Sequence, residues 1–341
     1  MSVFQTSNSC ENEEDNYVKF LIKTFTQELK ISKKIKEKHG HHTKEELKLK
    51  FLNYDFSSNK LIGINVLIKF LKNEELKTYD FDTIDLKDSS INLEYLSVIL
   101  KYLNENPFIT KLNLSRNYLG INELKLKLYP SISHYFSVNT TLKVLDLSKT
   151  TIQLSYIDYS IGNDEYSKQK FMFIIEIMNA IKSNPNSSIE EINLSDNEID
   201  KKCIYAISEM LETNKSLKKL DLSHNKFNGS LEILGKSLLL NQTLENLNIY
   251  NIFNSNIFSN EELINFGFII FNNYSLQEIY YLESFFENKI INIICKRNKK
   301  LVKSKEKIMN FMLAVRKQQT KKRIFPVELY DLIFSEYILT F

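Results

Sequence analysis

The stretch from residue 217 to residue 227 reads Leu217-Lys-Lys-Leu220-Asp-Leu222-Ser-His-Asn225-Lys-Phe227. Apolar residues occupy positions 1, 4, 6 and 11 of this frame, and asparagine occupies position 9. Side chains two positions apart point to the same face of a β-strand, so positions 4 and 6 predict the buried side of a short strand. An asparagine at the end of that strand can hydrogen-bond to backbone groups that would otherwise be buried without partners.

The frame recurs along most of the chain, often at intervals near 28 residues. Its copies begin at residues 51, 81, 109, 142, 189, 217, 244 and 276. Ser89 and Thr150 stand at position 9 in two copies and can replace only part of the asparagine's hydrogen bonding. Ile252 stands there in a third and cannot replace it, so we expect an irregularity near residues 250–258.

The segments between the predicted strands have helical spacing. Leu96, Ile99, Leu100 and Leu103 lie at i, i+3, i+4 and i+7, and residues 204–211 and 231–239 are similar. Each strand–helix unit can bury its apolar side only against its neighbours, so the units must stack into an array.

This frame resembles the leucine-rich repeat family, ribonuclease-inhibitor-like subclass, over roughly residues 47–286. The resemblance implies an α/β solenoid (a horseshoe) of about eight strand–helix repeats with a parallel sheet on its concave side. Apolar residues at helical spacing flank the repeats. They predict an N-terminal helical cap with a disordered start in residues 1–46 and a C-terminal helical cap in residues 287–341.

Composition excludes several functional classes. The 341 residues carry a formal net charge of +3, and the three cysteines lie far apart, which favours a reducing, cytoplasmic setting. No signal peptide, membrane-spanning run, phosphate-binding loop or hydrolase motif is present. The cluster of His39, His41 and His42 is either a metal site or an exposed loop, and the loop is favoured. We therefore predict no enzyme, no cofactor, no metal and no small-molecule substrate.

The predicted concave face carries the candidate binding residues. Acids outnumber bases there by five, which either keeps an exposed sheet soluble or forms an acidic groove for a basic protein. Aromatic and apolar side chains replace the polar ones at the C-terminal end, either as binding anchors or as contacts with the cap. The predicted partner-binding residues are Asp85, Asp146, Glu190, Asp221, Tyr250, Tyr280 and Leu282.

Three other segments have alternative interpretations. The extra residues at 153–170 form either a binding loop or a tolerated insertion. Residues 287–341 sum to +8, which indicates either a solvated cap or a contact with nucleic acid or anionic lipid. The end of the chain resembles the first helices of an F-box, which implies docking to the Skp adaptor of a ubiquitin ligase. The alternative is a plain amphipathic helix. The residues that carry this resemblance are Phe325, Pro326, Glu328, Leu329 and Ile333.

Together these features predict a non-enzymatic, cytoplasmic scaffold that recognises a protein through its concave face. Either a protist protein or an effector delivered into a host cell by an intracellular bacterium fits this composition. The alternatives are a substrate-recognition adaptor of a ubiquitin ligase and a protein that binds nucleic acid or anionic lipid through its basic C-terminal helices.

Overall fold

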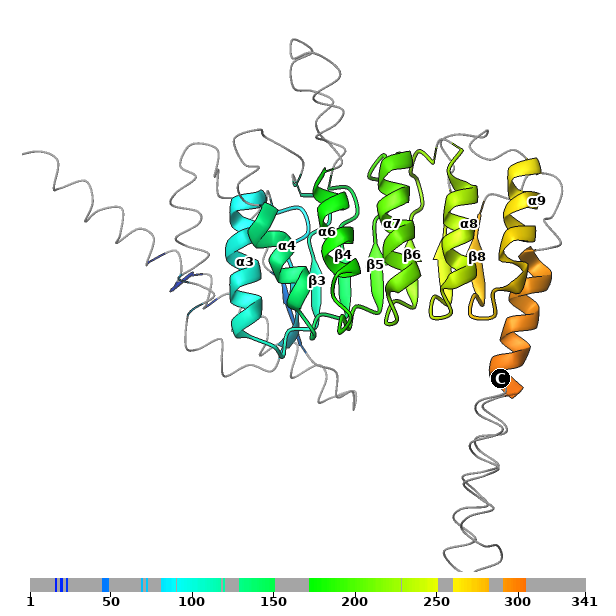
Figure 1. Ribbon diagram of the computed structural model, residues 1–341. Coiled ribbons are helices and arrows are strands. Elements are labelled where there is room, and N and C mark those ends of the chain that lie inside the picture. The colour runs from blue at the N-terminus through cyan, green and yellow to red at the C-terminus, as the bar shows by residue number, and fades with distance from the viewer. Residues whose placement is uncertain are drawn as a thin grey trace, which may run out of the picture.

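Stacked strand–helix units form the part of the chain that the computed structural model describes (Figure 1). This part comprises residues 81–89, 91–117, 119, 129–150, 172–227, 229–250, 260–281 and 291–304, together with the backbone of Glu45–Lys48 and the single residues 16, 19, 20, 23, 69 and 72. No helix within it is long and apolar enough to cross a membrane.

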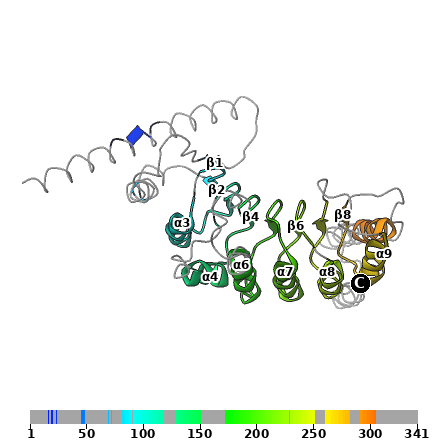
Figure 2. The same cartoon turned by 90° about the horizontal axis from the view of Figure 1, so that it is seen from above.

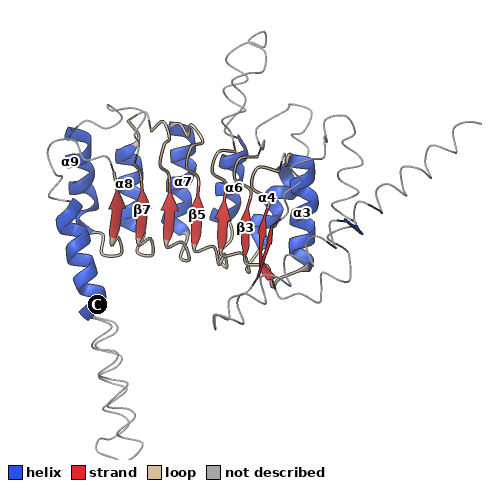
Figure 3. Cartoon of the chain, turned by 180° about the vertical axis from the view of Figure 1, so that it is seen from behind, coloured by secondary structure: helices blue, strands red, loops and turns tan. Residues whose placement is uncertain are grey.

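One parallel sheet runs through the described residues, and its strands are ordered as they occur in the sequence (Figure 3). The strands are β1 (Glu45–Lys48), β2 (Phe81–Asp85), β3 (Lys111–Asn113), β4 (Val144–Asp146), β5 (Glu191–Asn193), β6 (Lys219–Asp221), β7 (Asn246–Asn248) and β8 (Glu278–Tyr280). Seven of the eight predicted copies of the frame contain one of these strands. The parallel α/β solenoid predicted from the sequence is thereby confirmed.

A layer of helices covers the outer side of this sheet, as the view from above makes clear (Figure 2). The helices are α3 (Leu93–Glu105), α4 (Tyr129–Val138), α6 (Met172–Lys182), α7 (Lys201–Thr213), α8 (Leu231–Leu240) and α9 (Asn260–Ile269), which continues into the short 3-10 helix η4 (Ile270–Asn272). Residues 291–304 form a further helix beside α9. The exposed side of the sheet therefore lines the inner face of a shallow arc.

The core lies between the two layers and is built from the apolar positions of the frame. Residues at position 4 pair in register across seven strands and are buried from β2 to β7, with Ile279 of β8 partly buried at the end. This column is Ile84, Leu112, Leu145, Ile192, Leu220, Leu247 and Ile279. Full burial of one such side chain contributes roughly 1.5–3 kcal/mol. The column is therefore one of the contributions that hold neighbouring repeats together, beside the packing of neighbouring helices.

Where asparagine stands at position 9, in the repeats of β3, β5 and β6, it links its repeat to the one before it. Asn225 is buried, and its Oδ1 accepts hydrogen bonds from the backbone N–H groups of Asn197 and Ile199. Its Nδ2 donates to the carbonyl oxygens of Leu194 and Leu222. Asn117 and Asn197 occupy the same position and make the same type of contacts. The structural role that the frame predicts for this position is confirmed.

A second series of asparagines ends the helices and was missed from the sequence. The Oδ1 of Asn241 accepts from the N–H groups of Thr243 and Leu244, while its Nδ2 donates to the carbonyl oxygens of Leu211 and Asn214 in the previous repeat. Asn214 and Asn273 accept in the same way, and Asn273 also donates back to the repeat before it. The signal was available, because Asn-x-Ser/Thr-Leu recurs at residues 214, 241 and 273, three residues before a frame begins.

The first strand lies upstream of the position that the frame predicts. Leu47 of β1 pairs with Ile84, which places β1 partly inside residues 1–46, the segment predicted as a helical cap. Its sequence Glu-Glu-Leu-Lys is charged, which suits a strand at the edge of a sheet because charge discourages pairing with another chain. The copy predicted at 51–61 and most of the irregularity expected at 250–258 lie outside the described residues. The same holds for the loop at 153–170 and for the histidines at 39–42.

Candidate functional site: the inner face at strands β5 to β8

A tight turn follows each strand and uses the side chain at position 5. The N–H group of position 7 donates to Oδ1 of the Asp or Asn at position 5 over 2.8–3.1 Å in six repeats. In five of these repeats the residue at position 8 is described, and it has a φ of 56–57°, in the left-handed region that few non-glycine residues adopt. The acceptors are Asp85, Asn113, Asp146, Asn193, Asp221 and Asn248. The predicted binding residues Asp85, Asp146 and Asp221 therefore shape the turns.

Two of these carboxylates also bind the neighbouring strand. Nδ2 of Asn193 donates to Oδ2 of Asp146 over 3.3 Å, and Nδ2 of Asn248 donates to Oδ2 of Asp221 over 3.0 Å. Alternation of Asp and Asn at position 5 thus links the strands in pairs. These hydrogen bonds satisfy part of the carboxylate surface that an incoming basic group would need.

The glutamates of the inner face are paired with lysines. Glu190 lies 3.0 Å from the Nζ of Lys218 and 3.7 Å from that of Lys143. The hydrogen bond from Lys218 is the main reason that the pKa of the Glu190 carboxyl is held below its usual value. Glu191 and Lys219 form a similar pair at 3.3 Å. Around β5 and β6 the inner face therefore presents alternating charges rather than a continuous acidic strip.

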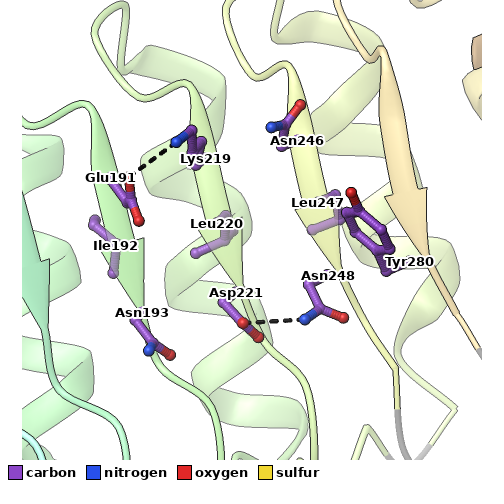
Figure 4. Close-up of a pocket in the computed structure, with 10 residues that line it drawn as sticks. All are labelled: Glu191, Ile192, Asn193, Lys219, Leu220, Asp221, Asn246, Leu247, Asn248 and Tyr280. Atoms are coloured by element: carbon purple, nitrogen blue, oxygen red, sulfur yellow. Dashed lines mark hydrogen bonds and ion pairs between the residues drawn. The ribbon is translucent and has the colours of Figure 1, made fainter.

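A shallow depression lies on this part of the inner face (Figure 4). Polar side chains of β5, β6 and β7 surround it, and Tyr280 of β8 lies at one end. Its lining residues are Glu191, Ile192, Asn193, Lys219, Leu220, Asp221, Asn246, Leu247, Asn248 and Tyr280. The structure thus brings the predicted residues Asp221 and Tyr280 together. Asp85 and Asp146 lie on β2 and β4, outside this depression.

Tyr280 is the exposed aromatic side chain of the site. Its side chain is 54% exposed, and its hydroxyl donates to Oε2 of Glu278 over 2.7 Å. Lys299, from the helix at residues 291–304, donates to Oε1 of the same carboxylate over 2.9 Å. These two hydrogen bonds lower the pKa of the Glu278 carboxyl, and the bond to Glu278 raises the pKa of the Tyr280 hydroxyl. The ring is thereby held in place while much of it faces solvent.

The remaining predicted residues have other positions. Tyr250 is half-buried at the end of β7, where its ring meets that of His224 edge-to-face at 5.8 Å between centroids. Leu282 and the F-box-like residues Phe325, Pro326, Glu328, Leu329 and Ile333 lie outside the described residues. Lys299 was not singled out from the sequence, because nothing in the basic C-terminal segment distinguishes it from the other lysines.

Neither a metal-ligand cluster nor an activated thiol is found among the described residues. Among the described residues, no three His, Cys, Asp or Glu side chains converge as metal ligands would. Burial raises the pKa of the thiols of Cys203 and Cys295, which keeps both cysteines in the unreactive thiol form. The described part of the inner face offers hydrogen-bonding groups and the fixed ring of Tyr280.

Comparison with protein-family models agrees with the repeat pattern. A family model described as "Leucine Rich repeat" matches residues 138–154 and 213–230, which contain two copies of the frame. The C-terminal domain of tropomodulin from Caenorhabditis elegans has 20% sequence identity, with 52% of this chain and 97% of that chain covered and a TM-score of 0.41. Actin-binding site 2 of leiomodin-1 has 19% identity, with 44% and 82% covered and a TM-score of 0.37. No curated protein matches the chain.

Proposed function

Since this chain is a leucine-rich repeat protein, we propose that it is a non-enzymatic scaffold that binds another protein across the inner face of its sheet. The binding site that we propose is the depression between β5 and β8, with Tyr280 as its anchor. The rigid array presents this surface without rearrangement, so little conformational entropy is lost on association. A specific interface of this type covers about 800 Å² of each partner.

One observation carries this proposal, namely the exposed ring of Tyr280 above a depression lined by hydrogen-bonding side chains. Tyrosine is enriched among the residues that dominate binding energy, because it buries a large area and loses little freedom. The hydrogen bond to Glu278, whose carboxylate is itself held by Lys299, already restricts this ring. Binding would therefore need little further ordering of the side chain.

The paired charges indicate the kind of partner. Glu190, Glu191 and Glu278 each have a lysine partner, so a strongly basic ligand would have to break ion pairs in order to form new ones. A polar segment with an apolar side chain that packs on Tyr280 loses no such contacts. We therefore propose a partner that is recognised through hydrogen bonds and aromatic packing rather than through net charge.

The test is affinity capture from cell lysate with the full chain as bait, followed by mass spectrometry. Tyr280→Ala should weaken capture of the main partner by ten-fold or more, as for an interface hot spot. Tyr205→Ala is the matched control, because Tyr205 is a similarly exposed tyrosine (49%) on the outer helix α7. Equal capture by the wild type and Tyr280→Ala would place the binding site elsewhere.

The adaptor function inferred from the F-box resemblance stays a prediction, because its residues lie outside the described part of the chain. The effector function and the cytoplasmic location also stay predictions. Deletion of residues 324–341 distinguishes the adaptor function from the scaffold function, because it removes the F-box-like segment and leaves the inner face intact. Loss of co-precipitated Skp adaptor upon this deletion would favour the adaptor function.

A further inference from the structure

The outermost residues of the helices change character at the last repeat. The asparagines Asn214, Asn241 and Asn273 end three successive helical segments with the same hydrogen bonds, so they align these segments with one another. The residues that lie nine, five and two positions before each asparagine therefore occupy corresponding places on the three segments. All of these side chains are exposed. On α7 they are Tyr205, Glu209 and Glu212; on α8 they are Glu232, Lys236 and Leu239; on α9 and η4 they are Ile264, Phe268 and Phe271. A mostly charged column becomes entirely apolar at the end of the array.

The apolar residues of this last column protrude far into solvent. Ile264 is 43% exposed, Phe268 is 63% exposed and Phe271 is 49% exposed. We call these three residues the apolar edge. They lie at i, i+4 and i+7 along one helical face, opposite to Leu263 and Phe266, which bury α9 against the core. Contiguous exposed apolar side chains of this size mark a contact surface, because water-facing helices ordinarily carry charge there.

A basic helix is attached beside the apolar edge. The guanidinium of Arg297 stacks on the rings of Tyr274 and Phe271, with centroid distances of 4.4 and 5.4 Å. It also donates a hydrogen bond to the carbonyl oxygen of Phe271 over 2.8 Å. These contacts attach the helix at residues 291–304 to η4 at Phe271, one end of the apolar edge, so its exposed lysines belong to an element that is fixed to this edge. The lysines of this basic flank are Lys296, Lys300 and Lys303.

We propose that the apolar edge and its basic flank bind the surface of an anionic lipid membrane. Membrane-surface helices combine large apolar side chains on one face with lysine or arginine beside them, so that the first enter the acyl boundary and the second meet the headgroups. Each lysine near an anionic leaflet strengthens binding by about five-fold. A two-fold contact between two copies would set one basic flank near the other, and the like charges disfavour that arrangement.

This surface is separate from the site proposed for a protein partner. The apolar edge lies on the outer, helical side of the last repeat, whereas Tyr280 lies on the inner face of the sheet (Figures 2 and 4). One chain can therefore hold a protein partner at a membrane, with the two contacts at different places of a rigid array. The membrane contact does not depend on the proposed scaffold function.

Sedimentation with vesicles tests this proposal on the purified full chain. Vesicles of phosphatidylcholine alone are compared with vesicles of phosphatidylcholine and phosphatidylserine, each at low and at high salt. We expect binding to the anionic vesicles that weakens at high salt. Phe268→Ser should lower the partition coefficient by about ten-fold or more, because a phenylalanine no longer enters the lipid. Lys300→Glu should lower it by at least about five-fold.

Tyr205→Ser is the matched control and should bind like the wild type, because Tyr205 is equivalent to Ile264 but lies on α7, away from the basic flank. Tyr280→Ala should also bind normally, which separates this proposal from the scaffold function. Absence of binding to anionic vesicles would overturn the proposal. So would binding that Phe268→Ser leaves intact, because the basic segment alone would then account for it. Self-association that Phe268→Ser abolishes, without vesicle binding, would identify a second copy as the occupant.

Discussion

Asparagine is the residue that makes this array continuous. At position 9 it ties the repeats of β3, β5 and β6 to the repeat before each, and at the ends of the helices a second series does the same on the other side of the core. Both series satisfy backbone groups that are buried where strand and helix turn away from each other. An unpaired buried backbone group costs about 1–3 kcal/mol, so these amides matter more than their small size suggests.

The substitution Asn225→Ala tests this role. It leaves the N–H groups of Asn197 and Ile199 without their acceptor in a buried site. We expect it to lower the free energy of unfolding by about 2–4 kcal/mol, as measured by denaturant titration. Asn179→Ala, on the exposed side of α6, is the control and should change the free energy of unfolding by less than about 0.5 kcal/mol. If Asn225→Ala lowers the free energy of unfolding no more than this control does, water replaces the hydrogen bonds of the Asn225 amide.

Residue patterns predicted the buried part of the frame better than its exposed part. Positions 4, 6 and 9 have one role each, so their residue types identify them. The aspartates at position 5 could serve a turn or a partner, and the sequence alone does not distinguish these roles. The structure shows that Asp221 accepts hydrogen bonds from Ser223 and Asn248. Likewise, the pairing of Glu191 with Lys219 depends on the register of two strands 28 residues apart in the sequence.

At the scale of elements, the helical spacing of apolar residues predicted where the helices lie. It did not predict how each helix packs against the next one. Within residues 231–239, Leu231, Leu234, Leu238 and Leu239 are the apolar residues at helical spacing. The first three are buried in α8 as predicted, whereas Leu239 is exposed. Four apolar residues at these spacings cover more of the helix circumference than one packing face needs. Gly235 of the same helix allows close packing, because a Cβ there would lie 3.1 Å from side-chain atoms of Phe266 and Ile269. Such close approaches depend on the geometry of two helices and are not visible in the sequence.

The contact between β8 and the C-terminal helix should depend on pH. The pKa of the Glu278 carboxyl is below its usual value because Lys299 and Tyr280 donate to it. The contribution of the Glu278 carboxylate to the stability of this contact is therefore complete above the ordinary pKa of about 4.3. It disappears as the pH falls through the lowered pKa, because the carboxyl is then protonated. Both side chains of the ion pair are well exposed, so the contribution should be below about 1 kcal/mol.

Hydrogen exchange of the amides in residues 291–304 measures this contribution. Glu278→Gln should speed exchange relative to the wild type by up to about five-fold at neutral pH, and the ratio should approach one at pH values well below 4. Lys236→Ala removes an exposed ion pair on α8 and is the control, with no effect on this helix. A ratio that is the same at both pH values would show that charge is not what holds the helix.

At the scale of the whole molecule, the described repeats form a one-dimensional array. The overall charge of +3 is a sum of −5 over residues 47–286 and +8 over residues 287–341, so near-neutrality hides two regions of opposite character. The described residues place the basic flank at one end and the paired charges along the inner face. Because these two regions are apart, two binding surfaces can be proposed on one continuous array: the depression on the inner face, and the apolar edge with its basic flank.

Stability should follow position in the array, because each repeat contacts only its neighbours. Ile207 on α7 is buried between two neighbouring repeats, whereas Ile294 is buried in the helix at residues 291–304, at the end of the described array. We expect Ile207→Ala to lower the free energy of unfolding by about 2–5 kcal/mol and to raise hydrogen exchange across residues 172–250. Ile294→Ala should raise exchange in residues 260–281 and 291–304 and leave residues 172–227 unchanged. Equal effects of the two substitutions on all segments would show that the array unfolds as a single unit instead of repeat by repeat.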